Sequence, residues 1–362
     1  MSQEPVDVNR YLYEQIYSAL KEEILSGKYC KGDWFPPERV LKERFNTTHL
    51  TVRNALAKLV LEGYIERYSG KGTLVIYSRD RPASRKSSLK FPYAHLILTG
   101  LDEANAHILE SLEAQLRKIP LPVHFSSHNG DLLLEESLYR EAEAKGALII
   151  LEPAGSLESL VHGELPMRNT IVIRSDAVPI PFPCARVVVD NALGARKAVR
   201  YLLDLGHRTI ALCNTGLPSA GDGIRQGFEE ELASRGITDS GDLVEGCSPG
   251  GDGGRSAVGR ILARREACRA FFCASDEIAA SAIRGLREAG LSAGTDCSVI
   301  GYGNVRISEA MGLTTVDPGF DRLAECVLSI ALEGMNRGAL GEEEFRIPPE
   351  LRIRDSSTSA GT

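Results

Sequence analysis

Short apolar runs alternate with longer amphipathic segments from residue 93 to near the end of the 362-residue chain. The apolar runs occupy residues 94–99, 147–151, 170–174, 186–189, 209–213, 270–274 and 298–301. Strands that are apolar throughout and alternate with helices are typical of parallel sheets covered by helices on both faces. This region is too long for one small sheet, so we expect an α/β body of two lobes. A ligand site would lie between the lobes, beyond the carboxyl ends of the strands.

The N-terminal part follows a different pattern, that of three short helices and a hairpin. Apolar spacing predicts one helix over residues 11–25 and a second over 37–45, and Thr47 or Thr48 is suited to cap a third. The inward-facing residues of the third helix would be Leu50, Ala55, Leu56, Leu59 and Val60. The segment YIERYSGKGTLVIY (64–77) predicts a hairpin. This series is typical of a winged helix-turn-helix, which offers the start of one helix to base edges in the DNA major groove.

Charge divides the chain in the same place. Residues 1–92 contain 16 Lys and Arg and 11 Asp and Glu, a net charge of +5, whereas the rest of the chain carries a net charge of −12. A basic head on an acidic body indicates a nucleic-acid-binding unit attached to another module. Residues 78–92 are polar, basic and rich in Pro and Ser, and they predict a linker.

Several classes of protein are disfavoured by missing motifs. Lys71 is followed by Gly72 and a predicted strand, so SGKGT is not a nucleotide-binding P-loop. The seven His and eight Cys residues show no HExxH or CxxC spacing, and no GxSxG motif occurs, so we expect neither a metal site, a cofactor nor an enzyme. The Gly-rich turn CSPGGDGGRS (247–256) leaves phosphate binding as a minor alternative. With no apolar run of membrane length and no signal-like N-terminus, we expect a cytoplasmic protein that does not enter the membrane.

The head resembles the DNA-binding domain of the GntR family of bacterial regulators. The resemblance covers residues 10–77 and is carried by GDWFPPERVLKERFNTTHLTVRNALAKLVLEGYIERYSGKGTLV (32–75). It implies contacts to double-stranded DNA from Arg39, Thr48, His49, Thr51, Arg53, Gly70 and Gly72. Lys71, at the tip of the predicted hairpin, would lie near a phosphate. His49 stands where the family usually has Arg, so the base preference at this position is not carried over.

The body resembles the sensor domain of the LacI/GalR family. The motifs are VVVDNALGARKAVRYLLDLGHRTIAL (187–212), FFCASDEIAASAIRGLREAGLSAGTDCSVIGYGN (271–304), LTTVDPGF (313–320) and PPELRIRDSS (348–357). The resemblance implies a fold like periplasmic sugar-binding proteins, a small-molecule effector in the cleft and a homodimer. A GntR-type head on this body is similar to arabinose-repressor-type regulators. We therefore divide the chain into a DNA-binding domain (1–77), a linker (78–92), an effector-binding domain (93–356) and a disordered tail (357–362).

The expected pocket departs from the family pattern. Arg225 lies two residues before Gly227, with Ile224 at the place of the usual Arg, and Gly303 replaces the usual Asp. Polar residues at or after predicted strand ends are the candidates for effector binding, and these are Asp102, Glu152, Asp222, Arg225, Ser275 and Asp276. Each of them could equally be a helix cap or a surface charge.

The sequence thus predicts a dimeric repressor that binds a palindromic operator under the control of an effector, with a sugar or sugar derivative implied by the family resemblance. An alternative stays open. The departures at Arg225 and Gly303 are compatible with a pocket that binds no sugar, which would leave a constitutive DNA-binding protein.

Overall fold

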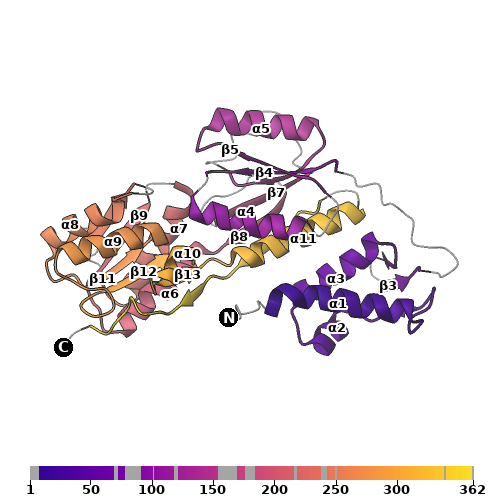
Figure 1. Ribbon diagram of the computed structural model, residues 1–362, viewed down its shortest axis with the longest axis horizontal. Coiled ribbons are helices and arrows are strands. Elements are labelled where there is room, and N and C mark those ends of the chain that lie inside the picture. Colours follow the sequence, from indigo (N-terminus) through magenta and orange to yellow (C-terminus); the bar gives the residue numbers. More distant parts are fainter. Residues whose placement is uncertain are drawn as a thin grey trace, which may run out of the picture.

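The computed structural model describes residues 8–68, 72–77, 91–100, 102–117, 121–153, 169–175, 184–215, 218–237, 243–248, 251–337 and 340–360. These residues form a small N-terminal unit, which we call the head (8–77), and a body of two lobes (Figure 1). Of the described residues, those within 91–190 and 320–347 form lobe 1, and those within 191–317 and 350–360 form lobe 2. The predicted α/β class with an N-terminal winged helix-turn-helix is confirmed.

The head consists of three helices and a small antiparallel sheet. Its elements are α1 (Val8–Leu25), β1 (Trp34–Phe35), α2 (Glu38–Phe45), α3 (His49–Leu61), β2 (Ile65–Tyr68) and β3 (Gly72–Val75). Thr48 caps α3, since its side chain accepts a hydrogen bond from the Thr51 amide at 3.2 Å. Strand β1 was not predicted; it pairs with β3 and widens the expected hairpin to three strands in the order β1-β3-β2. A core of its own holds the head together, including Ile16, Leu20, Leu41, Leu56 and Ile65.

Lobe 1 is a parallel sheet with helices on both faces. Its strands are β4 (Ala94–Leu98), β5 (Val123–Ser127), β6 (Leu148–Leu151), β7 (Thr170–Ser175), β8 (Ala185–Val189) and β14 (Glu344–Ile347), in the order β14-β8-β7-β6-β4-β5. Helices α4 (Glu103–Leu116) and α11 (Phe320–Arg337) pack on one face, and α5 (Leu132–Ala144) packs on the other. Burial on both faces is why the inner strands β4, β6 and β8 are apolar at nearly every position.

Lobe 2 repeats this plan with a sheet in the order β10-β9-β11-β12-β13-β15. Its strands are β9 (Ile210–Thr215), β10 (Val244–Cys247), β11 (Ala270–Cys273), β12 (Ser298–Tyr302), β13 (Thr314–Asp317) and β15 (Glu350–Arg352). Its helices are α6 (Asn191–Asp204), α7 (Pro218–Ser234), α8 (Gly253–Arg264), α9 (Asp276–Glu288) and α10 (Arg306–Ala310). Helices α6 and α7 pack on one face and α8 and α9 on the other, and only β15 runs antiparallel to its neighbour.

The lobes are joined where the chain passes between them near residue 190, at 318–319 and at 348–349. The seven apolar runs of the sequence become β4, β6, β7, β8, β9, β11 and β12. The other body strands were not predicted, because they are short and carry mixed polar residues such as those of HFSS (124–127). Among the described residues, no helix has both the length and the apolar character that crossing a membrane requires.

The C-terminal residues differ from the expectation of a disordered tail. Thr358 exchanges hydrogen bonds with Ser298, at 2.8 and 2.9 Å, and the Ala360 amide donates to the Leu205 carbonyl at 2.9 Å. Residues 357–360 therefore lie against lobe 2, because their backbone satisfies polar groups at the edge of its core. The other domain boundaries stay predictions.

Two glycines of α8 give a matched test of helix packing in lobe 2. A Cβ on Gly254 would lie 2.1 Å from the Ile278 carbonyl oxygen, whereas a Cβ on Gly259 would meet nothing within 4 Å. We expect Gly254→Ala to lower the free energy of unfolding by about 1–3 kcal/mol through overpacking. Gly259→Ala should raise it by about 0.5–1 kcal/mol, because alanine is the better helix former. Thermal melting of both variants checks the pair, and equal shifts would contradict this packing of α8 against α9.

Candidate functional site

The DNA-contacting residues implied for the head are only partly accessible. Arg39, Thr48 and His49 are exposed, and Arg39 makes a surface ion pair with Glu43 at 3.0 Å. Arg53 instead reaches the body, where its Nε lies 2.8 Å from a carboxylate oxygen of Glu333.

The remaining candidates of the head lie on α3 and on the wing. Thr51 is partly buried beside the Thr48 cap, with the two hydroxyls 2.8 Å apart. Gly72 opens β3 with φ +118, a left-handed conformation that favours glycine. Gly70 and Lys71 lie outside the described residues.

A cavity of about 190 Å³ opens between the lobes. It is lined by residues that follow strand ends of both sheets, among them Thr99, Asp102, Glu152, Asn191, Thr215, Ser275 and Tyr302. Parallel strands present their carboxyl ends at one edge of each sheet, so polar residues far apart in sequence meet there. The cavity is smaller than the roughly 300–1,000 Å³ typical of sites for drug-sized ligands. It therefore suits a compact ligand.

Two carboxyl groups give the cavity its polarity. Glu152 Oε2 accepts a hydrogen bond from the Thr99 amide at 2.9 Å, and the Asn105 side-chain amide lies 3.3 Å from it. Asp102 caps α4 by accepting from the Asn105 amide at 2.7 Å. Burial raises the pKa of both carboxyl groups above their usual values, and the nearby charge of Asp102 raises the pKa of Glu152 further. None of the described residues that line this cavity is a Lys, Arg or His.

Tyr302, Asn191 and Thr215 line the cavity but were not among the sequence candidates. Tyr302 donates a hydrogen bond from its hydroxyl to Asn191 Oδ1 at 2.5 Å, which ties the end of β12 to the start of α6. The Thr215 hydroxyl is buried and has no hydrogen-bond partner within the described part of the chain. These three residues lie at or just after strand ends, which could have pointed to them in the sequence. Tyr, Thr and Asn are too common at such positions to be recognised as site residues.

Asp276 does not line the cavity and has a structural role, although its neighbour Ser275 lines the cavity. Asp276 is fully buried, and its carboxylate accepts from the Val305 amide at 2.9 Å and from the Thr315 hydroxyl at 2.5 Å. It thereby joins α9 to β13 and to the loop after β12. Desolvation raises its pKa from 3.8 to about 6.

The two candidates on α7 are not brought into the cavity by the described contacts. Arg225 is exposed and pairs with Glu229 at 2.7 Å, whereas Ile224 lines the cavity. The helix period explains why Ile224 and not Arg225 lines the cavity, because successive side chains are turned by about 100° around the helix axis. The side chain of Asp222 lies outside the described residues.

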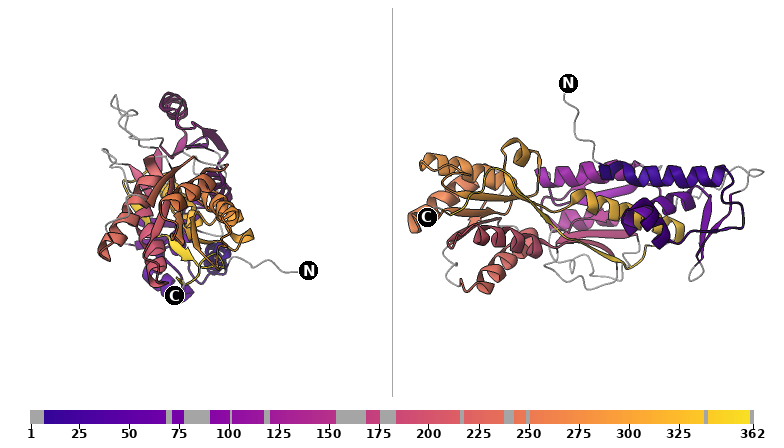
Figure 2. Two further views of the ribbon diagram at one scale, coloured as in Figure 1. Left: turned by 90° about the vertical axis from the view of Figure 1, so that its left-hand side faces the viewer. Right: turned by 90° about the horizontal axis from the view of Figure 1, so that it is seen from below.

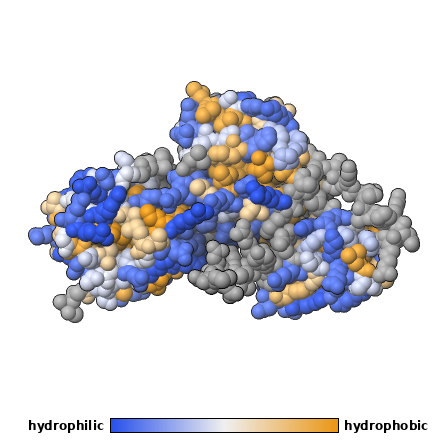
Figure 3. Space-filling view, in the orientation of Figure 1, coloured by the Kyte–Doolittle hydropathy of each residue, from blue (hydrophilic) through white to orange (hydrophobic). Residues whose placement is uncertain are grey.

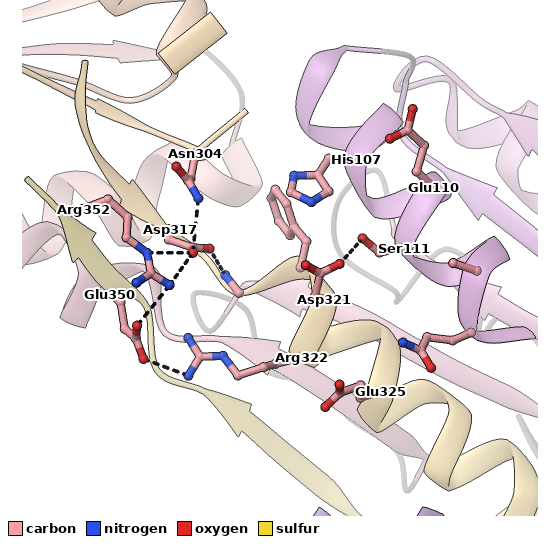
Figure 4. Close-up of a pocket in the computed structure, with 14 residues that line it drawn as sticks. His107, Glu110, Ser111, Asn304, Asp317, Asp321, Arg322, Glu325, Glu350 and Arg352 are labelled. Carbon is pink, nitrogen blue, oxygen red and sulfur yellow. Dashed lines mark hydrogen bonds and ion pairs between the residues drawn. The ribbon is translucent and has the colours of Figure 1, made fainter. Parts of the chain in front are cut away.

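A second cavity, of about 480 Å³, lies beside the crossings between the lobes (Figure 4). Four of its charged residues form ion pairs: Asp317 accepts from Arg352 at 3.1 Å, and Arg322 lies 3.1 Å from Glu350. Ser111 of α4 donates to Asp321 of α11 at 2.7 Å. These contacts connect the crossing segments to the helices of lobe 1, and we assign this cavity a structural role.

In the described part of the chain, cysteine and histidine side chains form no further site. All eight Cys residues are free, and seven of them are buried, as expected for small apolar side chains. Among the described residues, no three His, Cys, Asp or Glu side chains lie together in a way that could hold a metal ion.

Comparisons with known proteins found a matching family model for a region of the head and for a region of the body. Residues 12–75 match the model of bacterial regulatory proteins of the gntR family, and residues 199–357 match the periplasmic binding protein-like domain. The chain joins a GntR-family region to a periplasmic-binding-protein-like region. This confirms the two resemblances drawn from the sequence.

Relatives and solved structures agree with that arrangement. The arabinose metabolism transcriptional repressor of Geobacillus stearothermophilus is 26% identical over 94% of this chain and 97% of its own length. The transcriptional repressor PurR of Erwinia tasmaniensis is 36% identical over 47% of this chain, and the chain spans about half the length of the PurR relatives that it matches. The named relatives are transcription regulators, not enzymes.

Two solved structures share the fold. The regulator CelR in complex with cellobiose aligns over 98% of this chain and 100% of its own, with a TM-score of 0.64 and 17% identity. A dimeric Lac repressor aligns over 74% of this chain and 99% of its own, with a TM-score of 0.64 and 19% identity. At such identities the likeness concerns the fold alone.

The buried Asp276 predicts a pH dependence of stability. Because its folded-state pKa of about 6 lies above the usual 3.8, the folded protein holds a proton that the unfolded chain releases between those values. This contribution to stability is complete below about pH 4 and is lost as the pH rises through 6. We expect Asp276→Asn to remove up to about 3 kcal/mol of that dependence, at roughly 1.4 kcal/mol per tenfold change in proton affinity. Denaturant unfolding from pH 4 to 7 measures it, with the exposed Asp204→Asn as control; parallel profiles for wild type and Asp276→Asn would contradict the assignment.

The Thr215 hydroxyl predicts opposite effects on stability and binding. Thr215→Val removes a buried unpaired polar atom, so the free protein should melt at a higher temperature. If a ligand hydroxyl completes this site, the same variant should bind it about tenfold more weakly. Thermal shift against neutral pentoses and hexoses measures both, with the exposed Thr295→Val as control. Unchanged affinity for a sugar that binds the wild type would exclude Thr215 from the site.

Proposed function

We propose that this protein is a transcriptional repressor that binds operator DNA with its head and is controlled by a compact, uncharged effector in the cavity between the lobes. The observation that carries this proposal is the pairing of a winged helix-turn-helix with a two-lobed body whose strand ends enclose a polar cavity. The arabinose metabolism repressor, matched over nearly the whole chain, supports the repressor assignment.

The head supports sequence-specific binding of double-stranded DNA. Thr48, His49 and Thr51 stand at the first turn of α3, the part of a recognition helix that meets base edges. Arg39, exposed at the start of α2, is placed to bind a phosphate or a guanine. Gly72, with Gly70 and Lys71 before it, belongs to a wing that we propose lies along the backbone of the duplex.

The chemistry of the cavity favours a neutral sugar or sugar derivative over an anion. Asp102 and Glu152 would repel a sugar acid or sugar phosphate, and the described lining offers no positive charge to offset that repulsion. The same carboxyl groups, with the Thr215 hydroxyl, can pair with ligand hydroxyls. Ser275 belongs to the proposed site. On α7 it is Ile224, and not Arg225, that would pack against the ligand. Asp276 supports this site from behind by fixing the segments around it.

We propose that the protein acts as a homodimer, which two-fold operators require. Figure 3 shows hydrophobic side chains on the surface of lobe 1, at one end of α5 and below it. Leu132, Leu133 and Leu134 are 45%, 79% and 41% exposed at the start of α5. An exposed apolar patch of this kind favours contact with a second copy of the chain.

Arg39 gives a direct test of DNA binding. We expect Arg39→Ala to weaken binding about tenfold or more to a duplex that the wild type selects from a random-sequence library, because a charged contact to the DNA is lost. Arg117→Ala is the matched control, since Arg117 is equally exposed and pairs with Glu113 within one helix of lobe 1. Fluorescence anisotropy measures both variants. If both variants lose affinity for DNA equally, or if neither loses affinity, the result would count against the head as the DNA-binding unit.

A further inference from the structure

One face of the recognition helix α3 is covered by the body. Leu50, Arg53, Asn54 and Ala57 recur at the spacing of one helix face, and we call them the docking face. Helix α3 lies alongside α11 of lobe 1 (Figure 1), and Figure 2 shows the head at the end of the body formed by lobe 1. Leu50 was expected to face the core of the head, but it packs against the core of lobe 1.

The apolar part of this contact is buried. Ala57 is 1% exposed and belongs to the same core cluster as the residues of α11. Asn54 is 2% exposed, and its Nδ2 lies 3.5 Å from the Glu325 carbonyl oxygen. The docking face is therefore a packed interface between head and body.

The charged part of the contact involves Arg53, a residue expected to bind DNA. Arg53 Nε lies 2.8 Å from Glu333 Oε1, and its Nη2 lies 3.7 Å from Glu343 Oε1. Arg67 of β2 adds a weaker contact, with Nη1 3.9 Å from the same Glu333 oxygen. Glu333 is largely buried, so its ion pair is less screened than a surface pair. These glutamates present to Arg53 the kind of charge that a phosphate group would offer.

A duplex and α11 cannot occupy this position at the same time. A recognition helix fills a major groove about 12 Å wide, which leaves no room for a second helix about 10 Å across beside it. In this conformation the docking face of α3 is closed to DNA, whereas Thr48 and His49 at the start of the helix are exposed.

Helix α11 also reaches the cavity. Phe320 and Leu323, in its first turn, line the cavity, and Glu333 lies about 15 Å further along the same helix at the usual rise per residue. A ligand that shifts the first turn of α11 would also move the part of α11 that contacts α3, because a helix transmits displacement along its axis.

We propose that α11 is an autoinhibitory docking surface that competes with DNA for α3, and that the effector acts on this competition through the first turn of α11. This inference rests on the proposed function, because it presumes that α3 binds DNA. A conformation with α3 docked lowers the apparent affinity for DNA by the fraction of molecules in which α3 is free.

Glu333→Gln tests the competition in the full-length protein. It removes the charge that holds Arg53 and keeps the size of the side chain, so the undocked fraction should rise. We expect it to bind a mixed-sequence 30-base-pair duplex about tenfold more tightly than the wild type in fluorescence anisotropy at about 50 mM salt. Glu344→Gln is the control, since it removes the same charge from a residue that pairs with Arg186 and Arg346 inside the body.

A second measurement needs no variant. Hydrogen exchange of wild-type peptides from α11 should become faster when the same duplex is added, because DNA would withdraw α3 from that helix.

The outcomes separate the two proposals. Equal affinity of Glu333→Gln and Glu344→Gln, together with unchanged exchange in α11, would overturn the docking inference and leave DNA binding in place. No binding of the duplex by any of the three proteins would overturn DNA binding itself, and the competition with it. If Glu333→Gln fails to fold, the exchange experiment on the wild type decides alone.

Discussion

The parallel arrangement of strands in both sheets is the constraint on which the rest of the structure depends. Parallel strands need helical crossings, and those crossings cover both faces of each sheet with apolar side chains. Polar residues of the inner strands thereby gather at the strand ends, and the carboxyl ends of the two sheets face each other across the junction of the lobes. Glu152 after β6 and Ser275 after β11 meet at one cavity for this reason, although they are far apart in the sequence.

The division of charge has a second consequence inside the molecule. A basic head suited to phosphate also attracts the acidic body to which it is tethered, and in the competition proposed above the same arginine, Arg53, would serve both partners. Such a regulator does not need a large rearrangement to change its affinity for DNA. A modest change in the balance between two competing contacts is sufficient, since a tenfold change in affinity corresponds to about 1.4 kcal/mol.

Much of the fold could be predicted because its signals are local. Helix α3 follows from the capping Thr48 and an apolar spacing, and β9 follows from the apolar run IALC (210–213). Strands β1, β13 and β15 were missed because each is short and is stabilised by a neighbour that lies distant in the chain. The candidate site was predicted in outline, with Asp102, Glu152 and Ser275 at the cavity, whereas Arg225 and Asp276 have other environments.

The sequence by itself determined the class of fold, the winged helix-turn-helix and the separation of a basic head from an acidic body, because hydrophobic period, capping residues and charge act over a few neighbouring residues. Only the tertiary structure decided which side chains share the cavity, that Asp276 is a buried link between α9 and β13, and that Leu50 and Arg53 face lobe 1. These relations depend on how separate elements pack and on which hydrogen bonds burial makes obligatory, and no local pattern encodes them.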